Sequence, residues 1–137
     1  VVHVFIDNVV RGNNITIFGS GEQKRNFIFI DDLIDAYQSV FQKIRQGSNI
    51  AGEIYNFAGE EALVKEIAEK ITELGRTILG NNVTVEYKEG RKEALGTNLK
   101  VSVEKAKKIL GWEPKHTLDE GIRATFDYVY KKRQIRC

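Results

Sequence analysis

The sequence predicts a mixed α/β fold of the α+β kind, because short β-branched and aromatic runs alternate with longer segments of helical periodicity. The strand-like runs are residues 15–18, 26–30, 53–58 and 83–87, and residues 97–101 are a further extended stretch. The chain has 137 residues, of which 42% are hydrophobic. That composition is sufficient for one buried core, so a single unit over residues 1–137 is the predicted domain organisation.

Two helices are predicted in the first third of the chain. Residues 2–10 repeat apolar side chains at helical spacing up to a turn at Gly12, although residues 1–6 equally fit a buried strand. Asp31 or Asp32 can cap the next helix, and Gly47 follows it as a stop. One apolar stripe runs along this second helix and consists of Leu33, Ile34, Tyr37, Val40, Phe41 and Ile44.

Three more helices are predicted toward the C-terminus. Residues 63–74 form an amphipathic stripe that ends near Gly75 or Gly80. A short helix begins at Ser102 and is closed by Gly111. A capping box of Thr117 and Glu120 opens the last helix.

The charge pattern excludes several classes of partner. The formal net charge is only +2, with 21 basic and 19 acidic residues well mixed, so neither nucleic acid nor a membrane surface is an expected partner. The basic tail of Lys131, Lys132, Arg133 and Arg136 is interpreted as a solvated terminus. A single cysteine, Cys137, cannot form an intrachain disulfide, and no signal peptide or membrane span is visible, so a cytoplasmic location is predicted.

Several residues that suggest chemistry are better interpreted as structural. His3 and His116 have no ligand partners at metal-binding spacing, so no metal is predicted. Tyr128 and Lys132 have the spacing of a catalytic Tyr-x-x-x-Lys pair, but they lie in the terminal helix and no catalytic role is assigned to them. Trp112 is predicted to fill the core between the last two helices.

Three stretches together resemble the extended short-chain dehydrogenase/reductase family of NAD-dependent sugar-nucleotide epimerases and dehydratases. The stretches are ITIFGSGEQKRNFIFIDDL from Ile15, GEIYNFAG from Gly52 and VEKAKKILGWEPKHTLDEG from Val103. The chain resembles the C-terminal substrate-binding lobe of members such as UDP-glucose 4-epimerase and dTDP-glucose 4,6-dehydratase. The N-terminal Rossmann domain that would hold NAD and the catalytic residues is missing from it.

The resemblance implies a nucleotide-sugar site at the loop that ends with Arg25. Arg25 matches the family's phosphate-contacting arginine, and a planar guanidinium suits phosphate oxygens. Gln23 matches the glutamine of the same loop, which either bonds the nucleotide or braces the turn. The alternative role for Arg25 is a surface ion pair with Asp31 or Asp32. Asn26 replaces the aspartate that usually follows this arginine.

A second contact to phosphate or ribose is expected before the Leu-Gly-Trp helix. Arg91 is the candidate in EGRKEALGT, with Lys92 as the alternative if the loop is registered one residue later. Glu93 is the nearby carboxylate for the ribose. The competing interpretation is a solvated basic loop.

The expected function is therefore the nucleotide-sugar-binding portion of an NAD-dependent epimerase or dehydratase, inactive as an isolated chain. Its expected partners are a UDP- or dTDP-linked sugar and the missing Rossmann domain, and a homodimer is compatible with the resemblance. NAD is expected in the whole enzyme, bound by residues absent from this chain. The alternative is a non-catalytic binding or assembly module that has kept the family's lobe.

Overall fold

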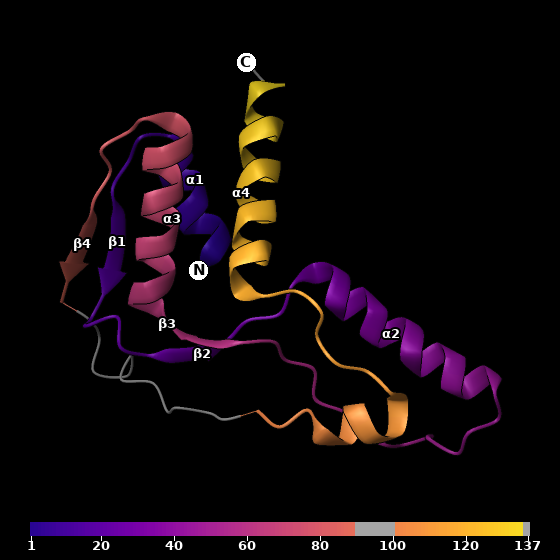
Figure 1. Ribbon diagram of the computed structural model, residues 1–137. Helices are drawn as coiled ribbons and strands as arrows, with labels where there is room; N and C mark the ends of the chain where they lie inside the picture. Colours follow the sequence, from indigo (N-terminus) through magenta and orange to yellow (C-terminus); the bar gives the residue numbers. More distant parts are fainter. Residues whose placement is uncertain (90–100, 136–137) are drawn as a thin grey trace. The chain divides into compact units, whose positions relative to one another are not determined.

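The computed structural model describes residues 1–89 and 101–135, and these form the predicted mixture of helices and strands (Figure 1). The described residues divide into two units, of which unit 1 contains residues 1–25, 62–89 and 119–135, and unit 2 contains residues 26–61 and 101–118. The elements in chain order are α1 (Val2–Val10), β1 (Ile15–Phe18), β2 (Lys24–Asn26), α2 (Ile30–Arg45), β3 (Glu61–Leu63), α3 (Val64–Leu79), β4 (Val85–Lys88), η2 (Ala106–Leu110) and α4 (Leu118–Gln134). The prediction of a single domain stays a prediction.

Unit 1 is built on a pair of parallel strands covered by helices. β1 pairs with β4 in a register that runs from Ile15 opposite Val85 to Phe18 opposite Lys88. Ile15 and Ile17 point to the same face because strand side chains alternate, and both are buried where α1 and α3 pack on the strands (Figure 1). The predicted strands at residues 15–18 and 83–87 are thus confirmed, the second with shifted ends.

The contact between α1 and α3 is close because α3 has a glycine at the crossing. A Cβ atom on Gly75 would lie 2.2 Å from Val9 Cγ1, so only hydrogen fits there. Asn81 adds a hydrogen bond, since its Nδ2 donates to the Val9 carbonyl over 2.8 Å. Helix α4 is linked to this pair by two ion pairs, Arg133 with Asp7 of α1 over 3.3 Å and Asp119 with Lys70 of α3 over 2.6 Å, and its Phe126 is fully buried. The core of unit 1 therefore comes from its own three helices and two strands.

Unit 2 consists of α2, the short η2 helix and extended segments. Its core contains Ala36, Ile50, Ala106, Leu110 and Trp112, and Phe57 meets Trp112 edge to face with 4.9 Å between ring centres. Trp112 is a core residue as predicted, but its core partners lie on α2, on η2 and at Phe57, whereas the position expected was between the last two helices. The helix expected after Ser102 is confirmed too, and Gly111 closes it with φ of 71°.

Asp32 organises the start of α2, although not as the expected cap. The cap position is Phe29, and Asp31 and Asp32 lie inside the first turn. The buried Asp32 carboxylate instead accepts hydrogen bonds from the backbone N–H groups of Lys115 and His116, both over 3.1 Å. Trp112 Nε1 donates to the Asp32 carbonyl over 3.0 Å. One residue of α2 thus fixes the turn that follows η2.

Two predicted strands are wrong. The strand expected at residues 26–30 is β2 at Lys24–Asn26, because Phe27 to Phe29 lead directly into the first turn of α2. The stretch 53–58 is not a strand, because it pairs with none of the described strands, and its backbone hydrogen bond within the described ranges is a turn bond from Glu53 N–H to the Ile50 carbonyl. The short β2 pairs instead with β3, which directly precedes α3.

Within the described ranges, no helix has the length and apolar character that a bilayer-crossing segment requires. The same ranges contain no group of three or more His, Cys, Asp or Glu side chains arranged to hold a metal ion.

Candidate functional site

The loop between β1 and β2 in unit 1 is shaped by glycines and braced by Gln23. Gly19 and Gly21 have φ values of 86° and 72°, a region that side chains other than glycine's rarely adopt. Gln23 Nε2 donates across the loop to the Phe18 carbonyl over 3.4 Å. The interpretation of Gln23 as a brace of the turn is therefore supported by its geometry.

The same loop caps the N-terminus of α3. Val64 N–H donates to the Gln23 carbonyl over 3.1 Å, and Lys65 N–H donates to the Gly21 carbonyl over 3.0 Å. Glu66 accepts from Leu63 N–H over 2.9 Å. A helix N-terminus often binds an anion through backbone N–H groups that have no partner in the protein. At the start of α3, the N–H groups of Leu63, Val64 and Lys65 are already hydrogen-bonded. An anion at this loop would have to be bound by side chains.

Gly21 is required at its position for a second reason besides its positive φ. A Cβ atom there would lie 3.0 Å from the Cβ of Lys65, at the start of α3. The loop therefore lies directly on the first turn of that helix. This close contact fixes the backbone from which β2 begins.

Arg25 lies on β2 and not in the loop, so a strand and not a flexible turn holds its backbone. The side chain is exposed, and its guanidinium donates to the neighbouring Lys24 carbonyl over 2.8 Å. Among the described residues of unit 1, no carboxylate forms an ion pair with Arg25. Since a guanidinium carries five N–H donors, most of them remain available to a ligand.

The ion pair proposed as the alternative role of Arg25 has no support from Asp32. The Asp32 carboxylate is already satisfied inside unit 2, where the His116 ring lies 2.9 Å from it in addition to the two backbone donors. These bonds hold the pKa of Asp32 below its usual value of 3.8, although burial acts in the opposite direction. Asp32 is therefore a structural carboxylate.

The second predicted contact falls on Arg91, Lys92 and Glu93, which lie outside the described residues. Of the five predicted site residues, the structure therefore describes Gln23 and Arg25, which lie two positions apart on one segment. The contact between Tyr128 and Lys132 does occur, with 3.3 Å between Nζ and the phenol oxygen. Tyr128 is 59% exposed on the terminal helix, so this pair is not enclosed in a site.

The residues of the glycine loop do not fit a dinucleotide. In a dinucleotide-binding unit, a glycine-rich turn joins a strand to a helix whose N-terminus faces the pyrophosphate. Here Gly19 and Gly21 join β1 to the second strand β2. The glycine loop therefore lacks the strand-turn-helix arrangement of a dinucleotide-binding unit.

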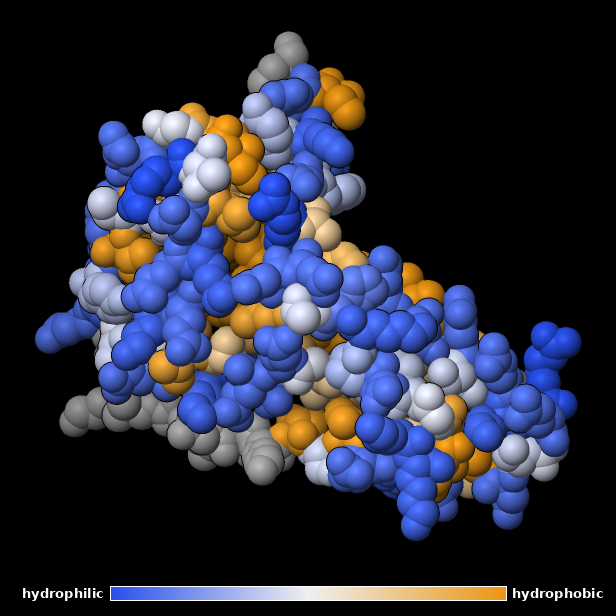
Figure 2. Space-filling model, in the orientation of Figure 1, coloured by the Kyte–Doolittle hydropathy of each residue, from blue (hydrophilic) through white to orange (hydrophobic). Residues whose placement is uncertain are grey.

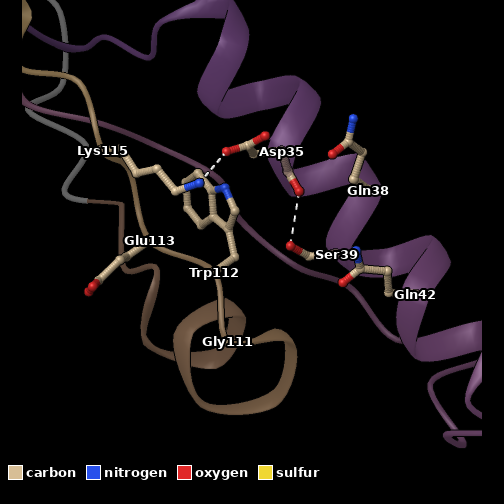
Figure 3. Close-up of a pocket in the computed structure, with 8 residues that line it drawn as sticks. All are labelled: Asp35, Gln38, Ser39, Gln42, Gly111, Trp112, Glu113 and Lys115. Atoms are coloured by element: carbon tan, nitrogen blue, oxygen red, sulfur yellow. Dashed lines mark hydrogen bonds and ion pairs between the residues drawn. The ribbon is translucent and has the colours of Figure 1, made fainter.

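Sequence reasoning missed a polar depression in unit 2, with a volume of about 340 Å³, between α2 and the turn after η2 (Figure 3). Lys115 Nζ lies 2.6 Å from an Asp35 carboxylate oxygen there, so the two charges neutralise each other. The Trp112 N–H is used elsewhere, and the depression is open and mainly polar. The sequence did contain a signal for this depression, because four polar residues of α2 are spaced three or four apart or adjacent and so lie on one side of the helix. They are Asp35, Gln38, Ser39 and Gln42.

Comparison with known proteins gives consistent matches over nearly the whole chain. A family model described as GDP-mannose 4,6 dehydratase matches residues 1–125. The low-salt glycan biosynthesis protein Agl12 of Haloferax volcanii is 31% identical over 126 residues, which are 90% of this chain and 37% of that protein. The UDP-glucose 4-epimerase of Mycolicibacterium smegmatis is 29% identical over 98% of this chain and 40% of its own length.

Solved structures show the same partial correspondence. UDP-glucose 4-epimerase of Thermotoga maritima, solved with UDP-glucose, has a TM-score of 0.77 at 27% identity, over 98% of this chain and 40% of its own. An epimerase of Methanothermobacter thermautotrophicus has a TM-score of 0.83 at 26% identity, over 98% and 38%. UDP-glucuronic acid 4-epimerase of Bacillus cereus, solved with UDP-glucuronic acid and NAD, has a TM-score of 0.77 at 26% identity, over 96% and 40%. This chain therefore spans about two fifths of the length of these relatives, and it matches their C-terminal part.

Proposed function

Because the chain belongs to the family of NAD-dependent epimerases and dehydratases that act on sugar nucleotides, we propose that it forms the nucleotide-sugar-binding portion of such an enzyme. Arg25 is the residue on which the proposal rests. Its guanidinium is exposed, has no ion-pair partner in the described part of unit 1, and projects from a strand whose preceding loop is tightly fixed. These are the properties required of a phosphate-binding side chain.

The chemical reason is the charge and shape of a pyrophosphate. Its oxygens need several donors and positive charge, and the planar fork of an arginine can donate two parallel hydrogen bonds to one phosphate. The capped N-terminus of α3 leaves side chains to supply this charge. Lys65 is partly neutralised by Glu22, with 3.3 Å between Nζ and the carboxylate, so Arg25 is the stronger candidate.

In this proposal the chain binds and orients the substrate and does not react with it. Contacts at the nucleotide end hold the distant sugar in place, and such remote binding energy can lower the barrier to a reaction elsewhere on the molecule. Gln23 has a positioning role, since it fixes the loop that precedes Arg25. NAD would be bound by the part of the enzyme that this chain does not cover, because the glycine loop does not fit it.

Calorimetric titration of the chain with UDP, dTDP, GDP and their glucose or mannose conjugates tests the proposal. We expect saturable binding of one nucleotide class, with UDP and dTDP as the leading candidates. The Arg25→Ala variant should bind that nucleotide roughly 10- to 100-fold more weakly, the effect of losing a hydrogen-bonding charge.

Arg76→Ala is the matched control for this variant. Arg76 is also an exposed arginine of unit 1, but it lies in the last turn of α3, whereas the glycine loop contacts the first turn. Its loss changes the net charge equally and should leave nucleotide affinity unchanged. If both variants weakened nucleotide binding equally, the effect would come from the net charge of the chain and not from a contact of Arg25. If none of the nucleotides bound, the proposed function would be contradicted.

A further inference from the structure

Unit 1 contains two copies of one short sequence motif. Residues 12–17 read GNNITI, and residues 80–85 read GNNVTV. Each copy begins with a glycine of positive φ, 74° at Gly12 and 66° at Gly80, and each leads from a helix into a strand. The two helices, α1 and α3, pack together, and the two strands, β1 and β4, pair in parallel (Figure 1). Both copies therefore belong to one helix-turn-strand repeat.

The two strands do not pair in the register that matches the two copies. Matched pairing would place Ile15 opposite Val83, but Ile15 lies opposite Val85, two residues further along β4. A shift by two residues keeps every side chain on its face of the strand, because strand side chains alternate. Val83 is buried and Val85 is half-buried, and the surface of unit 1 at the left of Figure 2 is mostly hydrophilic. The apolar pattern of β4 therefore fits both registers.

The side chain of Asn14 distinguishes the two registers. Its Oδ1 accepts a hydrogen bond from Thr84 N–H over 3.0 Å, and its Nδ2 donates to a Glu86 carboxylate oxygen over 2.6 Å. A hydrogen bond to an ionised group is roughly twice as strong as one between neutral groups. In the matched register, Asn14 would face Asn82 and Thr84 in place of Thr84 and Glu86, so the bond to the carboxylate would be lost. Asn14 thus favours the observed register.

The register determines which part of β4 holds the glycine loop. Gly19 N–H, at the start of the loop, donates to the Lys88 carbonyl at the end of β4 over 2.9 Å. In the matched register the Glu86 carbonyl would lie there, and β4 would extend roughly 7 Å further past the end of β1. That extension would run beside the loop, which already packs against α3 through Gly21. The support of the loop that leads to Arg25 therefore depends on the register.

We propose that Asn14 is a positioning residue for the nucleotide site, because it selects the register of β1 and β4 in which the end of β4 holds the glycine loop that places Arg25. Asn14 lies at the opposite end of β1 from that loop, so it acts through the two strands and not through a contact with the ligand. The proposal rests on the proposed function for the role of Arg25, but the strand pairing can be measured without a nucleotide.

Amide hydrogen exchange at Gly19 measures how firmly β4 holds the loop, since any change of register must break the bond from Gly19 N–H to Lys88. Asn14→Ala removes both side-chain bonds, and we expect exchange at Gly19 to become roughly tenfold faster in the 137-residue chain. Asn82→Ala alters the equivalent, exposed residue of the second copy and should leave that rate unchanged. An unchanged rate in Asn14→Ala, or an equal increase in both variants, would overturn the proposal.

Nucleotide affinity, measured far below the Tm, separates positioning from stability, because a chain that is only less stable still binds normally there. Asn14→Ala should bind the nucleotide about fivefold more weakly than the unaltered chain does. Asn14→Asp places a second carboxylate beside Glu86 and should be at least as weak.

A reciprocal exchange tests whether the bond between the two side chains is responsible. Combining Asn14→Asp with Glu86→Gln restores a donor and an acceptor with their roles reversed, so most of the affinity should return. A double variant as weak as Asn14→Asp would overturn the proposal. If the unaltered chain bound no nucleotide, the proposed function would be contradicted, and exchange at Gly19 would still test whether Asn14 fixes the strand register.

Discussion

The two units bury their interiors in different ways. Seven large side chains in the described residues are less than 2% exposed, and six of them are apolar residues of unit 1, namely Ile6, Val9, Ile15, Ile67, Ile71 and Phe126. The seventh is Asp32, the only one in unit 2. Unit 1 therefore has the more deeply buried apolar core. Unit 2 combines a smaller apolar core around Trp112 with the buried Asp32 carboxylate, and it leaves Ile34, Tyr37 and Phe41 of α2 exposed. The stability of unit 1 should therefore depend mainly on its apolar core, whereas that of unit 2 should depend also on the hydrogen bonds to the Asp32 carboxylate.

The largest difference between the units should come from the same substitution made in each. Phe126→Ala removes a fully buried ring from unit 1 and should lower the free energy of unfolding by about 3–5 kcal/mol. Phe41→Ala removes a ring that is 63% exposed and should change the free energy of unfolding of the free chain by about 0.5 kcal/mol or less. Urea denaturation followed by circular dichroism measures both. If the two variants lost similar free energies of unfolding, the proposed difference in burial between the two units would be contradicted.

Asp32→Ala should give the next largest effect, confined to unit 2. It leaves the N–H groups of Lys115 and His116 without their acceptor, at a cost of about 3 kcal/mol. Because the pKa of Asp32 is lowered in the folded protein, its ionised form stabilises unit 2 at neutral pH. This stabilisation is complete above the pKa that Asp32 has in the unfolded chain, and it is lost as the pH falls from there through the lower pKa of the folded protein.

Fluorescence of the chain's only tryptophan, Trp112, reports on unit 2 and can follow this loss during denaturation at a series of pH values. Asp32→Asn keeps the size of the side chain and should flatten the pH dependence below pH ~4. An unchanged pH profile in Asp32→Asn would show that other carboxyl groups dominate the acid sensitivity of unit 2.

Gly75→Ala tests the closeness of the α1 and α3 packing in unit 1. The added methyl group would lie 2.2 Å from Val9 Cγ1 and 2.9 Å from the side-chain oxygen of Asn81, so the helices must separate. We expect a loss of about 1–3 kcal/mol, typical of overpacking. Thermal unfolding provides the measurement, and a stability equal to that of the unaltered chain would mean that α1 is not held against α3 in solution.

Loss of an exposed ion pair should have the smallest effect. Lys107 Nζ lies 2.6 Å from a Glu113 carboxylate oxygen on the surface of unit 2. Glu113 raises the pKa of Lys107, and Lys107 lowers the pKa of Glu113, so each favours the charged form of the other. Both side chains are about 60% exposed, so solvent and salt screen the attraction. Lys107→Ala should leave thermal unfolding unchanged, and a clear fall in Tm would show that this pair is part of the structure that holds η2.

Sequence periodicity predicted the helices well because each one has a strong local signal. The glycines that end α3 and η2, Gly80 and Gly111, both have the positive φ that makes glycine favourable there. The strands were less predictable, since pairing depends on distant segments. Residues 53–58 have the composition of a strand, yet composition does not reveal whether a partner strand is present in the same chain.

The candidate site was predictable in part. The resemblance pointed to Gln23 and Arg25, and the structure adds that the loop before them caps α3. That capping depends on a contact between residues more than 40 positions apart in the sequence, which no local pattern encodes. Asp32 was misassigned as a helix cap for the same reason, since its partners lie more than 80 residues away.

A nitrogen-15 NMR titration of the chain with UDP-glucose tests the central claim most directly, because it locates the ligand as well as detecting it. The account predicts that the amide signals of residues 19–26, around Gln23 and Arg25 in unit 1, shift with increasing ligand, and that the Arg25→Ala variant loses these shifts. Shifts confined to α2 or to the polar depression beside it, or no shifts at all, would contradict the assignment of the nucleotide site to the glycine loop and Arg25.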